Sequence, residues 1–321
     1  MAEAKQVVKR SPEELRRVKA LGFLVNKGTD NFNARVITVN GKITAAQQQR
    51  IAEAAEKFGN GTITFTSRLT IEVPGVPFDE IENFRTYIAE AGLETGGTGS
   101  KVRPVVSCKG TTCQFGLVDT FGVSEELHHK FYKGYNDVKT PHKFKIGIGG
   151  CPNNCVKPDL NDLGIIGQLE PVLDLDECMG CKVCQPENIC PMNAISVVDG
   201  VMELDKELCN NCGLCVEKCP FDVIPEGNRG YKVTVGGRWG KIGERGKPLS
   251  KLVRTEEELN DIVEKTILLY REQGITGERL GQTVERLGMD NINEQLFGDE
   301  LMERKQEIID AELHTEGGAT C

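Results

Sequence analysis

Cysteine residues with the spacing of metal ligands are the most informative chemical feature of this chain. Twelve of its 13 cysteines fall in short groups between Cys108 and Cys219. Disulfides are rare in a reducing cytosol, where repeated pairs of cysteines two residues apart bind metals or carry redox chemistry instead. We therefore predict that the grouped cysteines ligate metal, with disulfides as the alternative.

Two successive runs of cysteines repeat one spacing. In each run three cysteines are separated by two residues, and a fourth stands directly before a proline: Cys178, Cys181, Cys184 and Cys190, then Cys209, Cys212, Cys215 and Cys219. This duplication is typical of bacterial two-cluster ferredoxins, in which the fourth cysteine of each run ligates the other cluster. It predicts one [4Fe–4S] cluster on Cys178, Cys181, Cys184 and Cys219. It predicts a second on Cys209, Cys212, Cys215 and Cys190. Zinc is the alternative, because four-cysteine zinc sites share this spacing.

Four further cysteines form two looser pairs. Cys108 and Cys113 enclose four residues, and Cys151 and Cys155 enclose three. Four thiolates in two such pairs can hold a third [4Fe–4S] cluster, while a zinc site or a pair of redox thiols are the alternatives.

Basic residues gather around these pairs. In the predicted strand before Cys151, Lys143 and Lys145 point to one face. The hydrophobic residues Phe144, Ile146 and Ile148 point to the other. Two lysines about 7 Å apart on one strand face repel each other unless an anion lies between them. Three arginines add to this charge: Arg35 near the start of the predicted strand 34–44, Arg68 in the predicted strand 62–73, and Arg103 five residues before Cys108. The pattern indicates an anionic substrate or cofactor, and solvated surface lysines are the alternative.

Strand and helix patterns surround these residues and must position them. Hydrophobic periodicity predicts strands over 34–44, 62–73, 102–106, 142–150 and 231–235, and helices over 45–59, 78–92 and from Thr255. Hydrophobic and polar residues alternate through 62–73, so we expect Arg68 on the polar face of one continuous strand. Cysteine-rich loops over 168–228 interrupt an α+β pattern that resumes after them. The last ~25 residues are polar and acidic, and predict either a helix or a loose tail.

The overall composition limits the classes of partner. The 321 residues carry a net charge of −9, which argues against nucleic acid or an anionic membrane as the main partner. No apolar run approaches the ~20 residues that span a bilayer. The first 20 residues are charged and lack the apolar core of a signal peptide, so we expect a cytoplasmic protein.

Several segments of the chain resemble blocks of the sirohaem sulfite/nitrite reductase family. They are VRPVVSCKGTTC (102–113), PHKFKIGIGGCPNNC (141–155) with the following DLGIIG, FTSRLTIEVPGV (65–76) and YKVTVGG (231–237). The chain is most similar to the small single-repeat members, such as the catalytic subunit of anaerobic sulfite reductase, and the likeness covers most of residues 30–275. The family's first cysteine pair usually encloses five residues, so the loop between Cys108 and Cys113 is one residue shorter.

The resemblance implies roles for the residues that match family motifs. Cys155 would bridge the third cluster to the iron of sirohaem, and Arg68 would bind sirohaem carboxylates. The substrate and its departing oxygens would meet Arg35, Arg103, Lys143 and Lys145. The resemblance also implies a ferredoxin-like half over residues 1–100, a sirohaem and [4Fe–4S] domain over 101–167 and 229–295, an inserted two-cluster ferredoxin domain over 168–228 and an acidic C-terminal tail over 296–321.

The expected activity is the six-electron reduction of sulfite to sulfide. Electrons would enter one at a time through the two ferredoxin-type clusters, from a low-potential donor such as ferredoxin or a partner reductase subunit, and we expect a homo- or hetero-oligomer. Nitrite enzymes of the family tend to carry Lys-x-Asn where this chain has Lys143 and Lys145, which favours sulfite; reduction of nitrite to ammonia is the alternative. A sirohaem-free electron-transfer subunit is the alternative from another class. For Cys321 we expect an incidental exposed thiol, with sulfur relay as the alternative.

Overall fold

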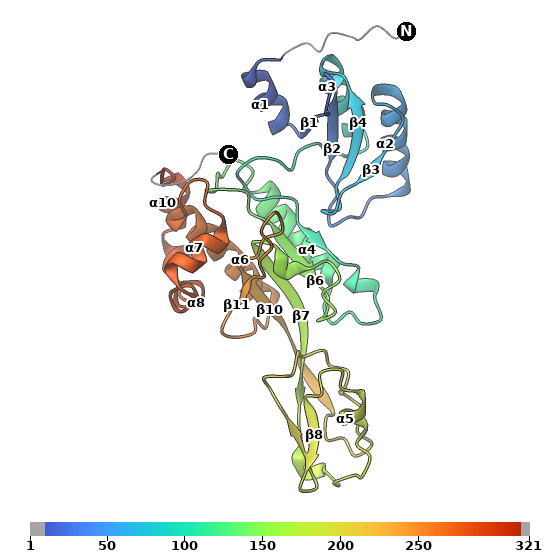
Figure 1. The fold of residues 1–321 in the computed structure, drawn as a ribbon, viewed down its shortest axis with the longest axis vertical. Helices are drawn as coiled ribbons and strands as arrows, with labels where there is room; N and C mark the ends of the chain where they lie inside the picture. Colours follow the sequence, from blue (N-terminus) through green and yellow to red (C-terminus); the bar gives the residue numbers. More distant parts are fainter. Residues whose placement is uncertain (1–9, 316–321) are drawn as a thin grey trace.

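The computed structural model describes residues 10–315, and Figure 1 shows three regions along its long axis. A small sheet with its helices lies at one end, a larger sheet covered by helices lies in the middle, and the cysteine-rich segment lies at the other end. The predicted α+β fold is confirmed. Cys321 lies outside the described residues. Among residues 10–315, no helix is both long enough and apolar enough to cross a bilayer.

Four antiparallel strands form the N-terminal sheet, in the order β1 (Phe23–Val25), β2 (Phe32–Val36), β4 (Ile71–Val76) and β3 (Thr64–Phe65). Its helices are α1 (Pro12–Ala20), α2 (Ala45–Phe58) and α3 (Ile81–Ala89), which the short turn η1 (Phe78–Glu80) precedes. α2 begins after Thr44 because this residue and Gln47 cap each other's backbone N–H groups. Buried Phe58 and Phe84 pack together between the helices and the sheet. The predicted helices 45–59 and 78–92 are confirmed.

The predicted continuous strand 62–73 is wrong, because this segment is a hairpin. β3 and β4 pair antiparallel, and Leu69 in the turn between them has a φ of 61°. The hydroxyl of Thr66 accepts hydrogen bonds from the N–H groups of Arg68 (3.3 Å) and Thr70 (3.2 Å). Alternation alone could not reveal this turn, since a threonine fits a polar strand position and also bonds to nearby backbone. Arg68 therefore lies at the tip of a hairpin and not on a strand face.

The predicted strand 34–44 is also shorter than expected. β2 ends at Val36, and Asn40 and Gly41 then form a turn with φ values of 51° and 82°. Asn-Gly is a strong signal for such a turn, because both residues tolerate positive φ. Because β2 begins at Phe32, Arg35 lies near the end of this strand and not at its start.

The central sheet has five strands in the order β11 (Lys247–Pro248), β10 (Glu226–Val235), β7 (Leu163–Val172), β6 (Ile146–Gly149) and β5 (Val106–Ser107). β5, β6 and β7 run parallel to one another, and β10 and β11 are antiparallel additions. Phe144, Ile146 and Ile148 enter the core on one side, as the alternation of 142–150 predicts. The short turns η2 (Gly110–Thr112) and η4 (Pro158–Leu160) follow β5 and β6.

Helices cover this sheet and bury its core. They are α4 (Thr120–Leu127) with its π-helical extension η3 (His128–Lys133), α6 (Glu256–Gln273), α7 (Leu280–Leu287) and α8 (Met289–Phe297). α6 begins where predicted, since the hydroxyl of Thr255 accepts a hydrogen bond from the Glu258 N–H. After it, α9 (Glu300–Glu303) and α10 (Lys305–Asp310) pack on α6 through buried Leu301 and Ile308. Of the two alternatives for the C-terminal segment, the structure therefore describes helices over 300–310.

The cysteine-rich segment projects from the central sheet on two long strands. β7 and β10 pair over ten residues each, from Leu163 opposite Val235 to Val172 opposite Glu226. Beyond them lie η5 (Leu175–Glu177), α5 (Gln185–Ile189) and the hairpin of β8 (Ile195–Val198) and β9 (Val201–Leu204). Figure 1 shows this unit at the end of the molecule opposite the N-terminal sheet.

Candidate functional site

The two loose cysteine pairs leave the same edge of the central sheet. β5 and β6 are parallel neighbours, so the segments with Cys108 and Cys151 both emerge from the carboxyl ends of their strands. The N–H of Gly150 donates to the sulfur of Cys108 at 3.2 Å. Burial raises the pKa of Cys151, and the charges of Cys108, Cys155 and Cys113 raise it further. The structure thus brings together the four thiols predicted for the third cluster.

Glycines let the backbone segments around these thiols approach one another closely. A Cβ on Gly150 would lie 2.8 Å from the Cα of Gly110, and one on Gly167 would lie 2.6 Å from the carbonyl oxygen of Gly150. No three Cys, His, Asp or Glu side chains between residues 10 and 315 lie close enough to hold a single metal ion. A four-iron cube is larger than one ion, so its cysteines stand farther apart than those of a zinc site.

Seven of the eight cysteines of the projecting unit fall into two groups, and in each group the fourth cysteine of one run lies with cysteines of the other run. Burial raises the pKa of Cys184, and nearby Glu187, Cys219 and Cys178 raise it further. Burial likewise raises the pKa of Cys215 to about 11, with Cys209, Cys212 and Cys190 adding to the shift. Backbone N–H groups donate to three of these sulfurs: Met202 to Cys178 (3.3 Å), Ala194 to Cys190 (3.3 Å) and Asn211 to Cys209 (3.4 Å).

One of these two groups lies against the cysteines of the central sheet. Cys212 and Cys151 line the same cavity of about 460 Å³, together with Phe115. Leu169 in β7 bridges to Cys212, and its N–H donates to the carbonyl of Asn211 at 2.8 Å. We call the group of Cys209, Cys212, Cys215 and Cys190 the inner group. We call the group of Cys178, Cys181, Cys184 and Cys219 the outer group.

A second cavity, of about 380 Å³, collects three of the predicted site residues: Arg68, Lys145 and Cys155. Arg68 reaches it from the hairpin tip and donates to the side-chain oxygen of Asn161 (2.7 Å) and to the Pro104 carbonyl (2.9 Å). Cys155, which also lines this cavity, is exposed. The N-terminal sheet and the central sheet therefore share this cavity.

The remaining predicted cations do not line this cavity; Arg35 and Arg103 lie near Arg68, and Lys143 lies near Lys145. Arg35 and Arg103 both donate to the carbonyl of Gly97, and Arg35 also pairs with Glu72 at 2.7 Å. Burial, followed by the charge of Arg35, lowers the pKa of Arg103 to about 10.

Burial and neighbouring positive charges also lower the pKa values of Arg68 and Lys145. Burial lowers the pKa of Arg68 to about 10; Asp162 opposes the shift, while Arg103 and Arg35 add to it. For Lys145, burial lowers the pKa to about 8, with contributions from Arg68 and from Lys143. The five predicted cations are thus near enough to repel one another.

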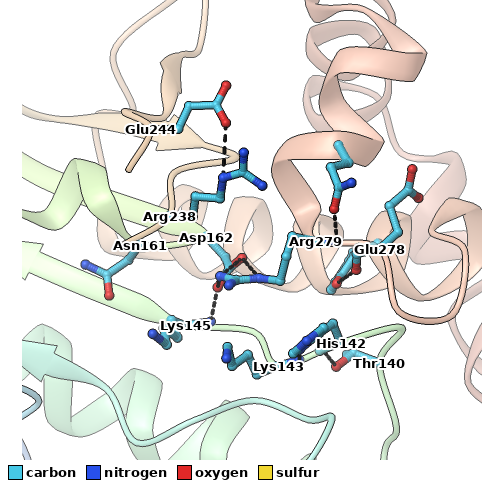
Figure 2. Close-up of polar contacts among 12 residues, drawn as sticks. Thr140, His142, Lys143, Lys145, Asn161, Asp162, Arg238, Glu244, Glu278 and Arg279 are labelled. Carbon is cyan, nitrogen blue, oxygen red and sulfur yellow. Dashed lines mark hydrogen bonds and ion pairs between the residues drawn. The ribbon is translucent and has the colours of Figure 1, made fainter. Parts of the chain in front are cut away.

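Two charged residues of the site were missed from the sequence, and Figure 2 shows them beside the lysines. Asp162 is fully buried and accepts three contacts from Arg279, at 2.7, 2.9 and 3.2 Å. It also accepts a hydrogen bond from the N–H of Lys145 at 3.0 Å. Asp162 opens the DLGIIG block, which was a usable signal. Arg279 precedes α7, 117 residues farther along the chain, and carries no local signal.

The cavity also includes Trp239, which no sequence motif had indicated. It is the chain's single tryptophan, lies in the glycine-rich loop after β10 and is 69% exposed. Neighbouring Arg238 pairs with Glu244 across this loop, as Figure 2 shows.

The residues present fit a large anionic cofactor next to a cluster. Several cations converge on one cavity, and the fully buried carboxylate among them is already bound by Arg279. The exposed thiol of Cys155 belongs both to this cavity and to the four-cysteine group behind it. A macrocycle that carries carboxylates and whose iron accepts a thiolate would have the matching chemistry.

Comparison with known proteins identifies the family. A family model described as the nitrite and sulphite reductase 4Fe-4S domain matches residues 98–305, well over half of the chain. The chain belongs to the nitrite and sulfite reductase family. A second model, the nitrite/sulfite reductase ferredoxin-like half domain, matches residues 25–91. The protein is therefore an oxidoreductase, and its family implies a [4Fe–4S] cluster and sirohaem.

Relatives in this family include sulfite reductases. The coenzyme F420-dependent sulfite reductase of Methanocaldococcus jannaschii is 32% identical over 260 residues, which are 80% of this chain and 40% of that protein. An uncharacterised protein of the same organism, MJ0551, is 30% identical over 86% of this chain and 94% of its own length. One of the subunits of the anaerobic sulfite reductase of Salmonella typhimurium is 31% identical over 46% of this chain and 47% of its own length. The match thus spans less than half the length of the two named reductases.

Solved structures agree on the fold. Dissimilatory sulfite reductase I superposes with a TM-score of 0.67 at 23% identity, covering 83% of this chain and 69% of that one. The NirA protein of Mycobacterium tuberculosis superposes with a TM-score of 0.61 at 16% identity, covering 97% and 49%. At these identities the likeness shows the fold alone.

Proposed function

We propose that this protein reduces sulfite to sulfide with six electrons, using one sirohaem and three [4Fe–4S] clusters. The observation that carries the proposal is the convergence of Arg68, Lys145 and exposed Cys155 on one cavity, directly in front of a four-cysteine group. The proposal divides the chain as the resemblance implies: a ferredoxin-like half over 1–100, a sirohaem domain over 101–167 and 229–295, an inserted ferredoxin domain over 168–228 and a C-terminal segment over 296–321. A cytoplasmic location stays a prediction.

Each proposed cofactor has its own residues. Cys108, Cys113, Cys151 and Cys155 would hold the cluster next to sirohaem, and the inner and outer groups would each hold one more. Cys155 would also reach the sirohaem iron, while Arg68 would bind the macrocycle's carboxylates. When bound, sirohaem would supply the iron that binds and reduces sulfite, and the clusters would supply single electrons.

The protein's own side chains manage charge and protons. Arg35, Arg103, Lys143 and Lys145 would offset the charge of the bound anion. Lys145, with a pKa lowered to about 8 by burial and by neighbouring Arg68, keeps a proton at neutral pH yet releases it more readily than an exposed lysine. It is therefore suited to deliver protons as the S–O bonds break.

The positions of the cysteine groups support one direction of electron supply. The inner group shares a cavity with the central cysteines through Cys212 and Cys151, so the outer group is the one that a donor would meet first. The donor is a low-potential protein, either ferredoxin or a partner reductase subunit. We expect a homo- or hetero-oligomer, in which a second chain would complete the cavity.

Nitrite reduction is the second candidate on the same site. Relatives named nitrite reductase cover about 45% of this chain; that of Escherichia coli is 35% identical over 148 residues. Lys145 favours sulfite, because a second cation offsets the larger charge of sulfite. A sirohaem-free electron-transfer subunit would need no cavity lined by Arg68 and an exposed cluster cysteine.

Reduced methyl viologen with sulfite tests the proposal. Anaerobically purified protein that contains about twelve cluster irons and one haem iron per chain should release sulfide, one for every six dye electrons. A fully loaded protein that oxidises the dye with nitrite but forms no sulfide from sulfite would make it a nitrite reductase. If the loaded protein contains only the iron of two clusters, the proposed third cluster is wrong.

A further inference from the structure

The inserted unit carries the entire net charge of the chain. Residues 168–228 contain 12 acidic and 3 basic residues, so their net charge of −9 equals that of all 321 residues, and the rest of the chain is neutral. Figure 1 shows this unit projecting from the molecule. The charge is therefore concentrated at one end.

Most carboxylates of this unit are exposed and form no ion pair with a described residue. Eleven of the twelve acids are exposed; the half-buried one is Glu170, which pairs with Arg254. None of the eleven takes part in an ion pair with a residue that the structure describes, whereas acids elsewhere pair often, as Glu72 does with Arg35. Unpaired charge of one sign produces a field that reaches beyond contact distance.

An apolar patch lies among these acids, on the loops of the outer group. It consists of Leu175, Met179, Val183 and Val201, which are 42–71% exposed. Met179 and Val183 alternate with the outer group's cysteines along one short loop. This loop packs on the turn between β8 and β9, since a Cβ on Gly180 would lie 2.5 Å from the carbonyl oxygen of Gly200. We call these four residues the outer patch.

We infer that the outer patch is the docking surface for the electron-donor protein, and that the donor's redox centre opens on an apolar surface ringed by lysines and arginines. The inference rests on the proposed function. Charge complementarity decides the partner, because the carboxylates around the patch, among them Asp176, Glu177 and Asp199, repel an acidic carrier. An acidic ferredoxin is therefore the wrong donor, and a basic-faced reductase subunit or carrier is the right one. In each encounter one electron would pass from the donor, which is thereby oxidised, to the cluster that the outer group would hold.

A basic cytochrome c, whose haem edge is ringed by lysines, is a probe for this surface. Dithionite-reduced protein, freed of excess dithionite, is mixed with ferric cytochrome c in a stopped-flow instrument, and each encounter passes one electron to the haem. Opposite charges steer association, so the rate constant should fall at least about tenfold between 0.02 and 0.3 M ionic strength. An acidic plant-type ferredoxin as acceptor should react more slowly at low ionic strength and speed up with salt.

Two variants and two matched controls localise the effect. D176N/E177Q and M179S/V183S should each slow the reaction with cytochrome c by roughly two- to fivefold at low ionic strength. The controls D79N/E56Q and V25S change exposed residues in η1, α2 and β1 of the N-terminal region and should leave the rate unchanged. Iron content and methyl viologen-driven sulfide release should stay the same in D176N/E177Q, since a small dye needs no docking surface.

The outcomes separate the inference from the proposed function. A rate that does not depend on salt, or controls that slow the reaction as much as D176N/E177Q, overturns the docking surface. A faster reaction with acidic ferredoxin than with cytochrome c at low salt overturns the basic partner. Failure of dye-driven sulfide release with all clusters present overturns the proposed function and leaves the cytochrome result standing.

Discussion

Replacing Arg279 by methionine should destabilise the protein strongly, because it leaves a buried carboxylate without its cation. The side chain of Asp162 is 0% exposed and that of Arg279 is 14% exposed, so water cannot take the place of the guanidinium. All three contacts from Arg279 would be lost, and among residues 10–315 the N–H of Lys145 would be the one remaining donor to the carboxylate. Breaking such a pair from one side costs roughly 3–5 kcal/mol.

The loss should depend on pH in a defined direction. Burial already raises the pKa of Asp162, and Arg279 opposes that shift, so R279M raises the folded-state pKa further above the unfolded value. A carboxyl group with a raised folded-state pKa contributes stability at low pH that is lost as the pH rises through that pKa. R279M should therefore lose less free energy of unfolding at pH 5 than at pH 8.

Urea unfolding of the anaerobic protein, followed by circular dichroism, measures this change in free energy. The double variant D162N/R279M removes the charge together with its partner and should recover most of the loss. A loss below about 1 kcal/mol at pH 8, or a double variant no more stable than R279M, would refute the reasoning.

Three further predictions concern the cavity that Arg68, Lys145 and Cys155 line. K145N should keep its cofactors but lose more turnover with sulfite than with nitrite, measured as kcat/KM for each; equal losses would mean that Lys145 does not discriminate. The kcat/KM for sulfite should fall as the pH rises through about 8, where Lys145 loses its proton, and K145R should move that limb to higher pH; a limb unmoved by K145R assigns it to another group. C155S should uncouple the magnetic signals of haem and cluster while the two ferredoxin-type clusters remain reducible; uncoupling in C151S alone would transfer the bridging role to Cys151.

Features that depend on residues close together in the sequence were predictable from local patterns. The spacing of the cysteines grouped Cys184 with Cys219, and Cys215 with Cys190, because short loops around a cube leave few alternatives. The start of α6 after Thr255 was likewise predictable from a capping residue and helical periodicity.

Features that depend on distant contacts were not predictable in this way. Arg68 does reach the expected cavity, but from a hairpin turn stabilised by Thr66, which the alternating pattern concealed. The pairing of Asp162 with Arg279 joins β7 to the start of α7 across 117 residues, and no periodicity encodes such a contact. The helices over 300–310 form because Leu301 and Ile308 are buried against α6. Their own hydrophobic periodicity is weak.

The optical spectrum of anaerobically purified protein, recorded before and after addition of sulfite, tests the central claim most directly. Sirohaem has a Soret band and a long-wavelength band that iron–sulfur clusters lack, and a bound anion shifts them. The account predicts both bands, at about one sirohaem per chain, with a shift on addition of sulfite that K145N weakens. A spectrum of iron–sulfur absorption alone, unchanged by sulfite in a protein that holds all its cluster iron, would contradict it.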